Sequence, residues 1–200
     1  MKERPVIFNG EMVRAILDGR KTQTRRVMKV QPESSGFGLR FITESLNNRD
    51  TGKYFWSQSD ACGINKPRSK PFPCPFGRVG DRLWVRETFG DCGNRLVYRA
   101  DTEDGAASQV KRWVPSIHMP REACRILLEI TAVRVERLND ISEEDARAEG
   151  CCYGRGGGVP DFAVTPADHF PTLWASIYGE ESWRATPWVW VIEFRRVEVK

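Results

Sequence analysis

The sequence is poor in the patterns that build metal centres and cysteine–histidine dyads. It has only two histidines, which leaves little material for a Cys–His nucleophilic pair. Its six cysteines contain no C-x2-C pair of the kind that holds structural zinc. We therefore expect no metal and no other cofactor. Two cysteine pairs remain as alternatives for a metal site: Cys62 with Cys74, and Cys151 with Cys152.

Long apolar segments are also missing. The longest apolar run, 188–192, has five residues, whereas a bilayer-spanning helix takes roughly 20. The first ten residues, MKERPVIFNG, contain no apolar stretch of signal-peptide length. The adjacent Cys151 and Cys152 fit a disulfide framework poorly, which favours reduced cysteines. We expect a cytoplasmic protein that has no membrane partner.

Tryptophan and positive charge, in contrast, are well represented. The 200 residues include seven Trp, and 31 Lys and Arg stand against 27 Asp and Glu, a formal net charge of +4. A mild positive balance with many flat rings suits a nucleic acid or nucleotide partner. The alternative is that the Trp residues form the core and the Arg residues a solvated face. The length predicts one domain over 1–200, and we expect a monomer.

The apolar patterns predict an α+β fold. Two segments, 31–77 and 151–166, are dominated by turn residues and form loop-rich insertions. We expect Phe55 and Trp56 to anchor the first of them. Alternation predicts strands at 5–9, 27–30, 82–89, 95–99, 125–130, 133–138 and 188–199, and helical spacing predicts helices at 11–18, 142–149 and 167–178. The predicted elements do not alternate between strand and helix, so the sequence does not indicate a parallel sheet. We therefore expect a curved, mostly antiparallel sheet or small β-barrel.

A basic cluster at 20–26, RKTQTRR, is the first candidate for chemistry. Lys21 and Thr24 lie three residues apart and can converge in an extended or turn conformation. Neighbouring Arg residues push the pKa of a lysine down, because like charge disfavours the ammonium form. Such a lysine can act as general base for a threonine nucleophile. The alternative is a basic surface loop that contacts phosphates or nothing.

An acidic helix at 142–149 is the second candidate. Residues 131–150 hold six acids and three Arg, and the first thirty residues hold eight cations and three acids. These opposite charges can draw the two segments together. Acids in the first turn are explained by the helix dipole, but Glu149 lies at the opposite end, where the dipole disfavours an anion. We expect a Lys or Arg partner for Glu149.

A third candidate is the stretch GDRLWVRE at 80–87. Strand alternation places Trp84 and Arg86 on one face and Val85 and Glu87 on the other. A Trp–Arg face can stack on a base and hold a phosphate. The alternative is a structural Arg86–carboxylate pair. Among the other tryptophans, spacing assigns Trp174, Trp188 and Trp190 to the core and leaves Trp56 and Trp113 as further stacking candidates.

Four motifs in order resemble the ASCH domain family. These motifs are GRKTQTRR after a short helix, GDRLWVRE on a strand, ISEEDARAEG on a later helix and a closing VWVIEF strand. The chain is similar to larger bacteriophage and prophage-borne members of that family. The resemblance implies a PUA-like β-barrel with a cleft that faces RNA or nucleosides. Small bacterial relatives are amidohydrolases that remove the acetyl group from N4-acetylcytidine.

The resemblance also implies roles for particular residues. The catalytic set of those hydrolases falls on Lys21, Thr24 and Glu149. In the implied mechanism Thr24 attacks the amide carbonyl or orders a water, Lys21 carries the proton, and Glu149 orients Lys21. The residues expected to bind substrate are Arg26, Trp84, Arg86 and Glu87, with either Arg26 or a backbone N–H stabilising the oxyanion. Two alternatives remain: an RNA-binding or RNA-cleaving module carried by a phage, and an accessory protein that binds a host protein through its insertions.

Overall fold

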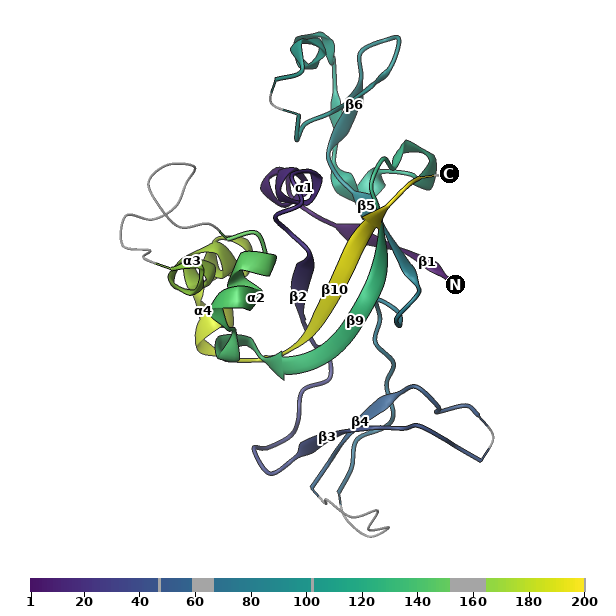
Figure 1. Ribbon diagram of the computed structural model, residues 1–200, viewed down its shortest axis with the longest axis vertical. Coiled ribbons are helices and arrows are strands. Elements are labelled where there is room, and N and C mark those ends of the chain that lie inside the picture. The colour runs from purple at the N-terminus through teal and green to yellow at the C-terminus, as the bar shows by residue number, and fades with distance from the viewer. Residues whose placement is uncertain (47, 59–66, 102, 152–164, 200) are drawn as a thin grey trace.

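A five-stranded sheet lies at the centre of the molecule (Figure 1). The computed structural model describes residues 1–46, 48–58, 67–101, 103–151 and 165–199. The strand order is β1-β5-β9-β10-β2. The strands are β1 (Glu3–Ile7), β2 (Gln23–Val27), β5 (Arg82–Arg86), β9 (Leu127–Arg137) and β10 (Trp188–Val197). Strand β9 joins the two strands predicted at 125–130 and 133–138, and its register against β10 shifts at Glu193/Phe194.

The predicted PUA-like barrel is wrong, although the α+β class agrees with the structure and three of the four strand pairs in the sheet are antiparallel. The sheet is mixed, because β1 runs parallel to β5. Strands β1 and β2 lie at the two ends of the strand order, and no pairing between them closes the sheet in the part of the chain that the structure describes. A parallel pair needs a long crossover connection, and the chain between β1 and β5 supplies one. Alternation identified strands but not their partners or directions.

Helices pack against both faces of the sheet. They are α1 (Gly10–Leu17), α2 (Glu143–Ala148), α3 (Pro166–Tyr178) and α4 (Glu180–Arg184). Helix α1 places Val13 and Ile16 in the main core, whereas α2 and α3 lie on the opposite face. Helices α2 and α3 pack on β10 through Ala146, Phe170 and Trp174, which meet Val189 and Val191. The alternate residues of β10, including Trp190 and Ile192, enter the main core on the other face. None of the helices that the structure describes is long and apolar enough to span a bilayer.

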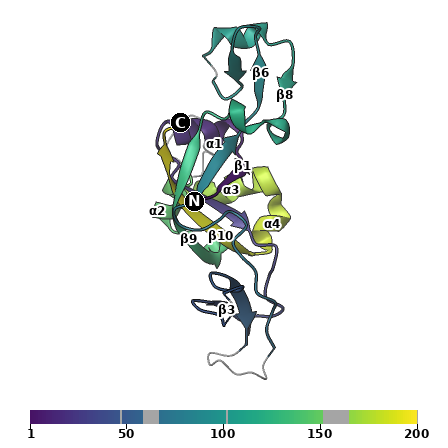
Figure 2. The same ribbon diagram turned by 90° about the vertical axis from the view of Figure 1, so that its right-hand side faces the viewer.

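The two ends of the molecule carry small sheets (Figures 1 and 2). The insertion at 31–77 forms the pair β3 (Gly38–Phe41) and β4 (Tyr54–Ser57), and the opposite end carries β6 (Phe89–Asp91), β7 (Leu96–Tyr98) and β8 (Trp113–Val114). Trp56 is 1% exposed, packs 5.2 Å from Trp188 and donates from Nε1 to the Val30 carbonyl at 3.0 Å. Trp56 therefore anchors the insertion, and its expected role as a base-stacking residue is wrong. Most of the insertion at 151–166 lies outside the described residues.

A buried ion network as the candidate functional site

Strand β2 turns the basic cluster into two faces. The strand occupies 23–27 instead of the predicted 27–30 and pairs antiparallel with β10, with Thr24 opposite Ile192 and Arg26 opposite Trp190. Side chains alternate along a strand, so Thr24 and Arg26 share the main-core face while Gln23 and Arg25 face α2. The strand therefore holds Thr24 and Arg26 apart from Gln23 and Arg25, whereas in a loop these side chains could have come together.

Lys21 and Glu149 form a buried pair at the end of α2. Gly19 turns the chain after α1 with φ of 75°, and the Thr22 amide donates to the Ala148 carbonyl at 2.8 Å. Lys21 Nζ donates to Glu149 Oε2 at 2.6 Å and to the Glu149 carbonyl oxygen at 3.0 Å. The two side chains are 1% and 5% exposed. The cationic partner that Glu149 was expected to need is therefore present.

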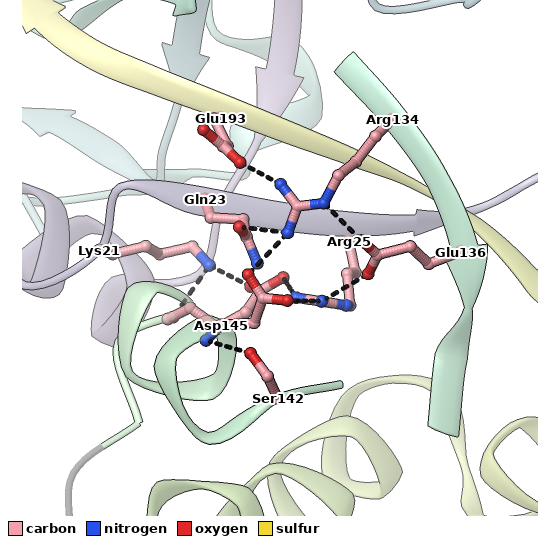
Figure 3. A network of polar contacts seen from close by, with 9 residues as sticks. Lys21, Gln23, Arg25, Arg134, Glu136, Ser142, Asp145 and Glu193 are labelled. Atoms are coloured by element: carbon pink, nitrogen blue, oxygen red, sulfur yellow. Dashed lines mark hydrogen bonds and ion pairs between the residues drawn. The ribbon is translucent and has the colours of Figure 1, made fainter. Parts of the chain in front are cut away.

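Arg25 is a second partner, which the sequence analysis did not single out. Its side chain is fully buried, and Nη2 donates to Glu136 Oε2 at 3.0 Å and Asp145 Oδ2 at 2.9 Å (Figure 3). Its Nη1 lies 3.6 Å from Glu149 Oε1. The opposite charges of the first thirty residues and of 131–150 were the signal that pointed to such a contact. Glu149 is thus shared between a lysine and an arginine.

Arg134 closes the network on the side of β9 (Figure 3). Its Nη2 donates to Asp145 Oδ1 at 2.6 Å and to Gln23 Oε1 at 3.2 Å, and other nitrogens pair with Glu136 and Glu193. We call this set the buried ion network: Lys21, Gln23, Arg25, Arg134, Glu136, Asp145, Glu149 and Glu193. Three cations face four carboxylates. A cleft of about 420 Å³ opens beside the network, and its lining includes Gln23 and Arg134 but neither Lys21 nor Glu149.

Burial lowers the pKa of Lys21 below its usual 10.5, because desolvation disfavours the ammonium form. The carboxylate of Glu149 opposes this shift, and the charge of Arg26 adds to it. A lysine of this kind can give up its proton more readily than an exposed one. The network can therefore hold and transfer a proton at Lys21 Nζ.

This shift predicts how stability depends on pH. Between the lowered pKa of folded Lys21 and 10.5, the unfolded chain binds more protons than the folded chain, so the free energy of unfolding rises with pH in that window. The measurement is urea unfolding at about pH 7 and about pH 10. The reference is a variant with Lys21→Met and Glu149→Leu, which removes both charges of the pair. We expect the free energy of unfolding of the natural chain, relative to that of this reference, to be higher at about pH 10 than at about pH 7. A difference that stays constant or falls would contradict the lowered pKa of Lys21.

Thr24 is not hydrogen-bonded to the pair. Its side chain is 1% exposed and makes no hydrogen bond to Lys21 or Glu149 in the structure. Lys21 Nζ and the Arg26 guanidinium nevertheless lie over the same Phe8 ring, at 5.7 and 5.2 Å from its centroid. Thr24 shares the strand face of Arg26. The structure therefore brings Lys21 and Glu149 into contact and places Thr24 on the face that borders Phe8.

The residues predicted on β5 are divided between two surfaces. Arg86 lies 5.4 Å from the Trp84 ring centroid and donates to the Ile117 carbonyl, and it has no carboxylate partner among the described residues. Glu87 points the other way and accepts from Arg125 Nε and Nη2 at 2.8 and 2.9 Å. The alternation predicted for this strand is confirmed, and the structural Arg86–carboxylate alternative is not seen.

No group of three or more potential metal ligands occurs within the described ranges of the chain. Of the two cysteine pairs left open for a metal, each has one member, Cys62 or Cys152, outside those ranges.

Comparisons with known proteins assign no family. No protein-family model matches the chain, and no curated protein matches it. Among solved structures, the crystal structure of protein EF3133 from Enterococcus faecalis V583, attributed to family-model DUF984, aligns with a TM-score of 0.44 and 11% identity. That alignment covers 100% of this chain and 83% of that chain. This similarity assigns neither a fold family nor a function.

Proposed function

We propose that the protein is an ASCH-like hydrolase that cleaves the N-acyl amide of a modified nucleoside such as N4-acetylcytidine, with Lys21 and Glu149 as its proton-transfer pair. The observation that carries this proposal is the contact of 2.6 Å between Lys21 Nζ and Glu149 Oε2, made by two buried side chains 128 residues apart. The four ASCH-like motifs also support the proposal, and this support does not depend on a barrel fold. The lowered pKa of Lys21 suits a general base.

The proposed reaction uses residues around Phe8. Neutral Lys21 takes the proton of the Thr24 hydroxyl as its oxygen attacks the amide carbonyl, or does the same for a water that Thr24 orders. Arg26 stabilises the resulting oxyanion. Lys21 then returns the proton to the leaving 4-amino group of cytidine, and a water hydrolyses the Thr24 ester to release acetate when that ester has formed. Glu149 holds Lys21 Nζ in place throughout.

A cleft on the Arg26 side of β2 suits a flat base. It measures about 430 Å³, and besides Arg26 its lining is largely apolar, with Ile7, Met12 and Ile177 among its residues. Apolar walls with a few polar groups are typical of small-molecule sites. Thr24 lies on the same strand face but, like Lys21 and Glu149, is not among the lining residues. The size and apolar lining of the cleft, next to Arg26, support a nucleoside as its ligand.

A nucleic-acid-binding module without chemistry is the second candidate. The observation that favours it is the guanidinium of Arg86 over the Trp84 ring, which offers stacking and positive charge together. Ile7 pairs in register with Arg86 and is 44% exposed, and Ile117 beside Arg86 is 59% exposed. These residues make an apolar and cationic surface next to the cleft on the Arg26 side.

Acetate release tests the proposal. Purified protein is incubated with N4-acetylcytidine, and acetate and cytidine are quantified against an incubation without protein. We expect the two products in equal amounts. Absence of turnover in a preparation whose circular dichroism shows a folded protein would overturn the hydrolase. Salt-dependent binding of single-stranded RNA by that same preparation would then favour the second candidate, because phosphate contacts release counterions.

A further inference from the structure

A second polar cleft lies apart from the Lys21–Glu149 pair. It measures about 360 Å³ and opens between the start of α1, the chain just after β5 and the chain just after β7. Its lining residues are Asn9, Gly10, Glu11, Arg14, Glu87, Thr88, Arg99 and Ala100. Neither Lys21 nor Glu149 is among them. The volume falls within the range of about 300–1,000 Å³ that is usual for small-molecule sites.

Glu87 forms the rigid acidic part of this cleft. The residue is 2% exposed, and Arg125 holds both of its carboxylate oxygens, at 2.8 and 2.9 Å. Arg125 in turn is held by two hydrogen bonds to Asp101, at 2.7 and 2.8 Å, and lies 4.0 Å from the Tyr98 ring centroid. A carboxylate has about four lone-pair positions, and Arg125 uses two of them. Glu87 lines the cleft and therefore keeps lone-pair positions that can accept a hydrogen bond from a ligand.

Two arginines form the basic part. Arg14 Nη1 donates one hydrogen bond to the Ala100 carbonyl oxygen at 3.2 Å. The Arg99 side chain is exposed and makes no hydrogen bond or ion pair with any residue that the structure describes. Its backbone is anchored, because the Arg99 amide donates to the Thr88 carbonyl at 2.9 Å across the cleft wall. Most guanidinium N–H groups of the pair therefore remain for a ligand.

The charges of the cleft select a ligand of mixed character. Arg14 and Arg99 favour an anion, and Arg forks match phosphate oxygens in two-point contacts. Glu87 and Glu11 disfavour a purely anionic ligand and require a donor. A phosphate attached to a sugar meets both needs, since the phosphate oxygens accept from arginine and the hydroxyl groups donate to a carboxylate.

We propose that this cleft binds a nucleoside monophosphate, with the phosphate on Arg14 and Arg99 and a ribose hydroxyl on Glu87. The site is separate from the pair that we assign to hydrolysis. Asn9 and Thr88 line the cleft and supply further polar groups for the ligand. Because binding is the readout, the proposal stands or falls independently of the hydrolase.

Calorimetric titration tests this site. The probes are cytidine 5′-monophosphate, cytidine and inorganic phosphate, each added to the full chain. We expect the nucleotide to bind at least about tenfold more tightly than either part alone, since one charge-assisted hydrogen bond contributes about that much. Equal affinity for the nucleotide and for phosphate would overturn the role of Glu87, and absence of nucleotide binding would overturn the site.

Matched arginine variants locate the binding. Arg99→Ala removes an exposed guanidinium that lines the cleft, and Arg95→Ala removes an exposed guanidinium of the same hairpin that pairs with Asp104 outside it. We expect Arg99→Ala to weaken nucleotide binding about tenfold to 100-fold and Arg95→Ala to leave it unchanged. Nucleotide binding that resists Arg99→Ala, or that falls equally with Arg95→Ala, would overturn the assignment. Both residues are exposed, so neither substitution leaves a cavity in the core.

Discussion

Replacement of Arg25 by methionine is expected to lower the free energy of unfolding by about 3–5 kcal/mol. The side chain is fully buried and meets three carboxylates, those of Glu136, Asp145 and Glu149. Without it, among the described residues, Glu149 keeps Lys21 and Asp145 keeps Arg134 as the remaining cationic partner. Removing one member of a buried ion network leaves an uncompensated charge in a medium that solvates it poorly. Urea unfolding followed by circular dichroism measures the loss.

An exposed arginine provides the matched control for this variant. Arg184 is 67% exposed and pairs with Glu180 and Glu181 on α4, so Arg184→Met is expected to change stability by less than about 1 kcal/mol. Arg25→Lys should fall between the two, because a lysine keeps the charge but cannot reach the three carboxylates with one planar fork. Equal stability of Arg25→Met and Arg184→Met would mean that the network does not hold α2 against the sheet.

Replacement of Lys21 by methionine is expected to lower kcat/KM for N4-acetylcytidine by about 10²–10⁴-fold, the usual contribution of a general acid–base group. Thr24→Val should remove the nucleophile or the water ligand, whereas Thr24→Ser keeps the hydroxyl and should retain most activity. The control is Lys53→Met, since Lys53 lies in the 31–77 insertion and pairs with Asp50. Full activity of a folded Lys21→Met protein would remove Lys21 from the reaction.

The pH profile separates a catalytic from a merely structural role for Glu149. The carboxylate of Glu149 raises the pKa of Lys21 against the effect of burial. Glu149→Gln removes that charge, so the pKa of Lys21 should fall further and the rising limb of the pH–rate profile should move to lower pH. A lower rate with an unmoved profile would indicate that Glu149 only supports the fold.

Much of the local structure could be predicted from sequence. The helices at 11–18, 142–149 and 167–178 are present with shifts of about a residue at their ends, and the alternation of Trp84 and Arg86 against Val85 and Glu87 is observed. Core positions such as Trp174 and Trp190 were also correct. These features depend on residues close in the chain, whose spacing decides which side chains share a face.

The features that the sequence did not predict are contacts between residues far apart in the chain. Residues 23–26 of the basic cluster belong to strand β2, which pairs with β10. Nothing in the sequence RKTQTRR predicts that pairing. Trp56 was expected both to anchor the 31–77 insertion and to be available for base stacking. Its contacts with Trp188 and Val30 bury it, so the anchor is confirmed and the stacking role is wrong. Arg125 and Asp101 behind Glu87 were not foreseen for the same reason, since 14 to 38 residues separate these three positions in the chain.

The sequence by itself determined three of the four helices and the strands near 82–89, 125–138 and 188–199, that two segments of opposite charge attract, and that Glu149 needs a cation. Only the tertiary structure decided that the sheet is mixed and open, that Arg25 shares Glu149 with Lys21, and that Glu87 lines a cleft while Trp84 lies under the Arg86 guanidinium on another surface. The physical reason is that periodicity records the direction of a side chain relative to its own backbone. Which groups it then meets depends on how distant segments pack, and burial in that packing lowers the pKa of a residue such as Lys21.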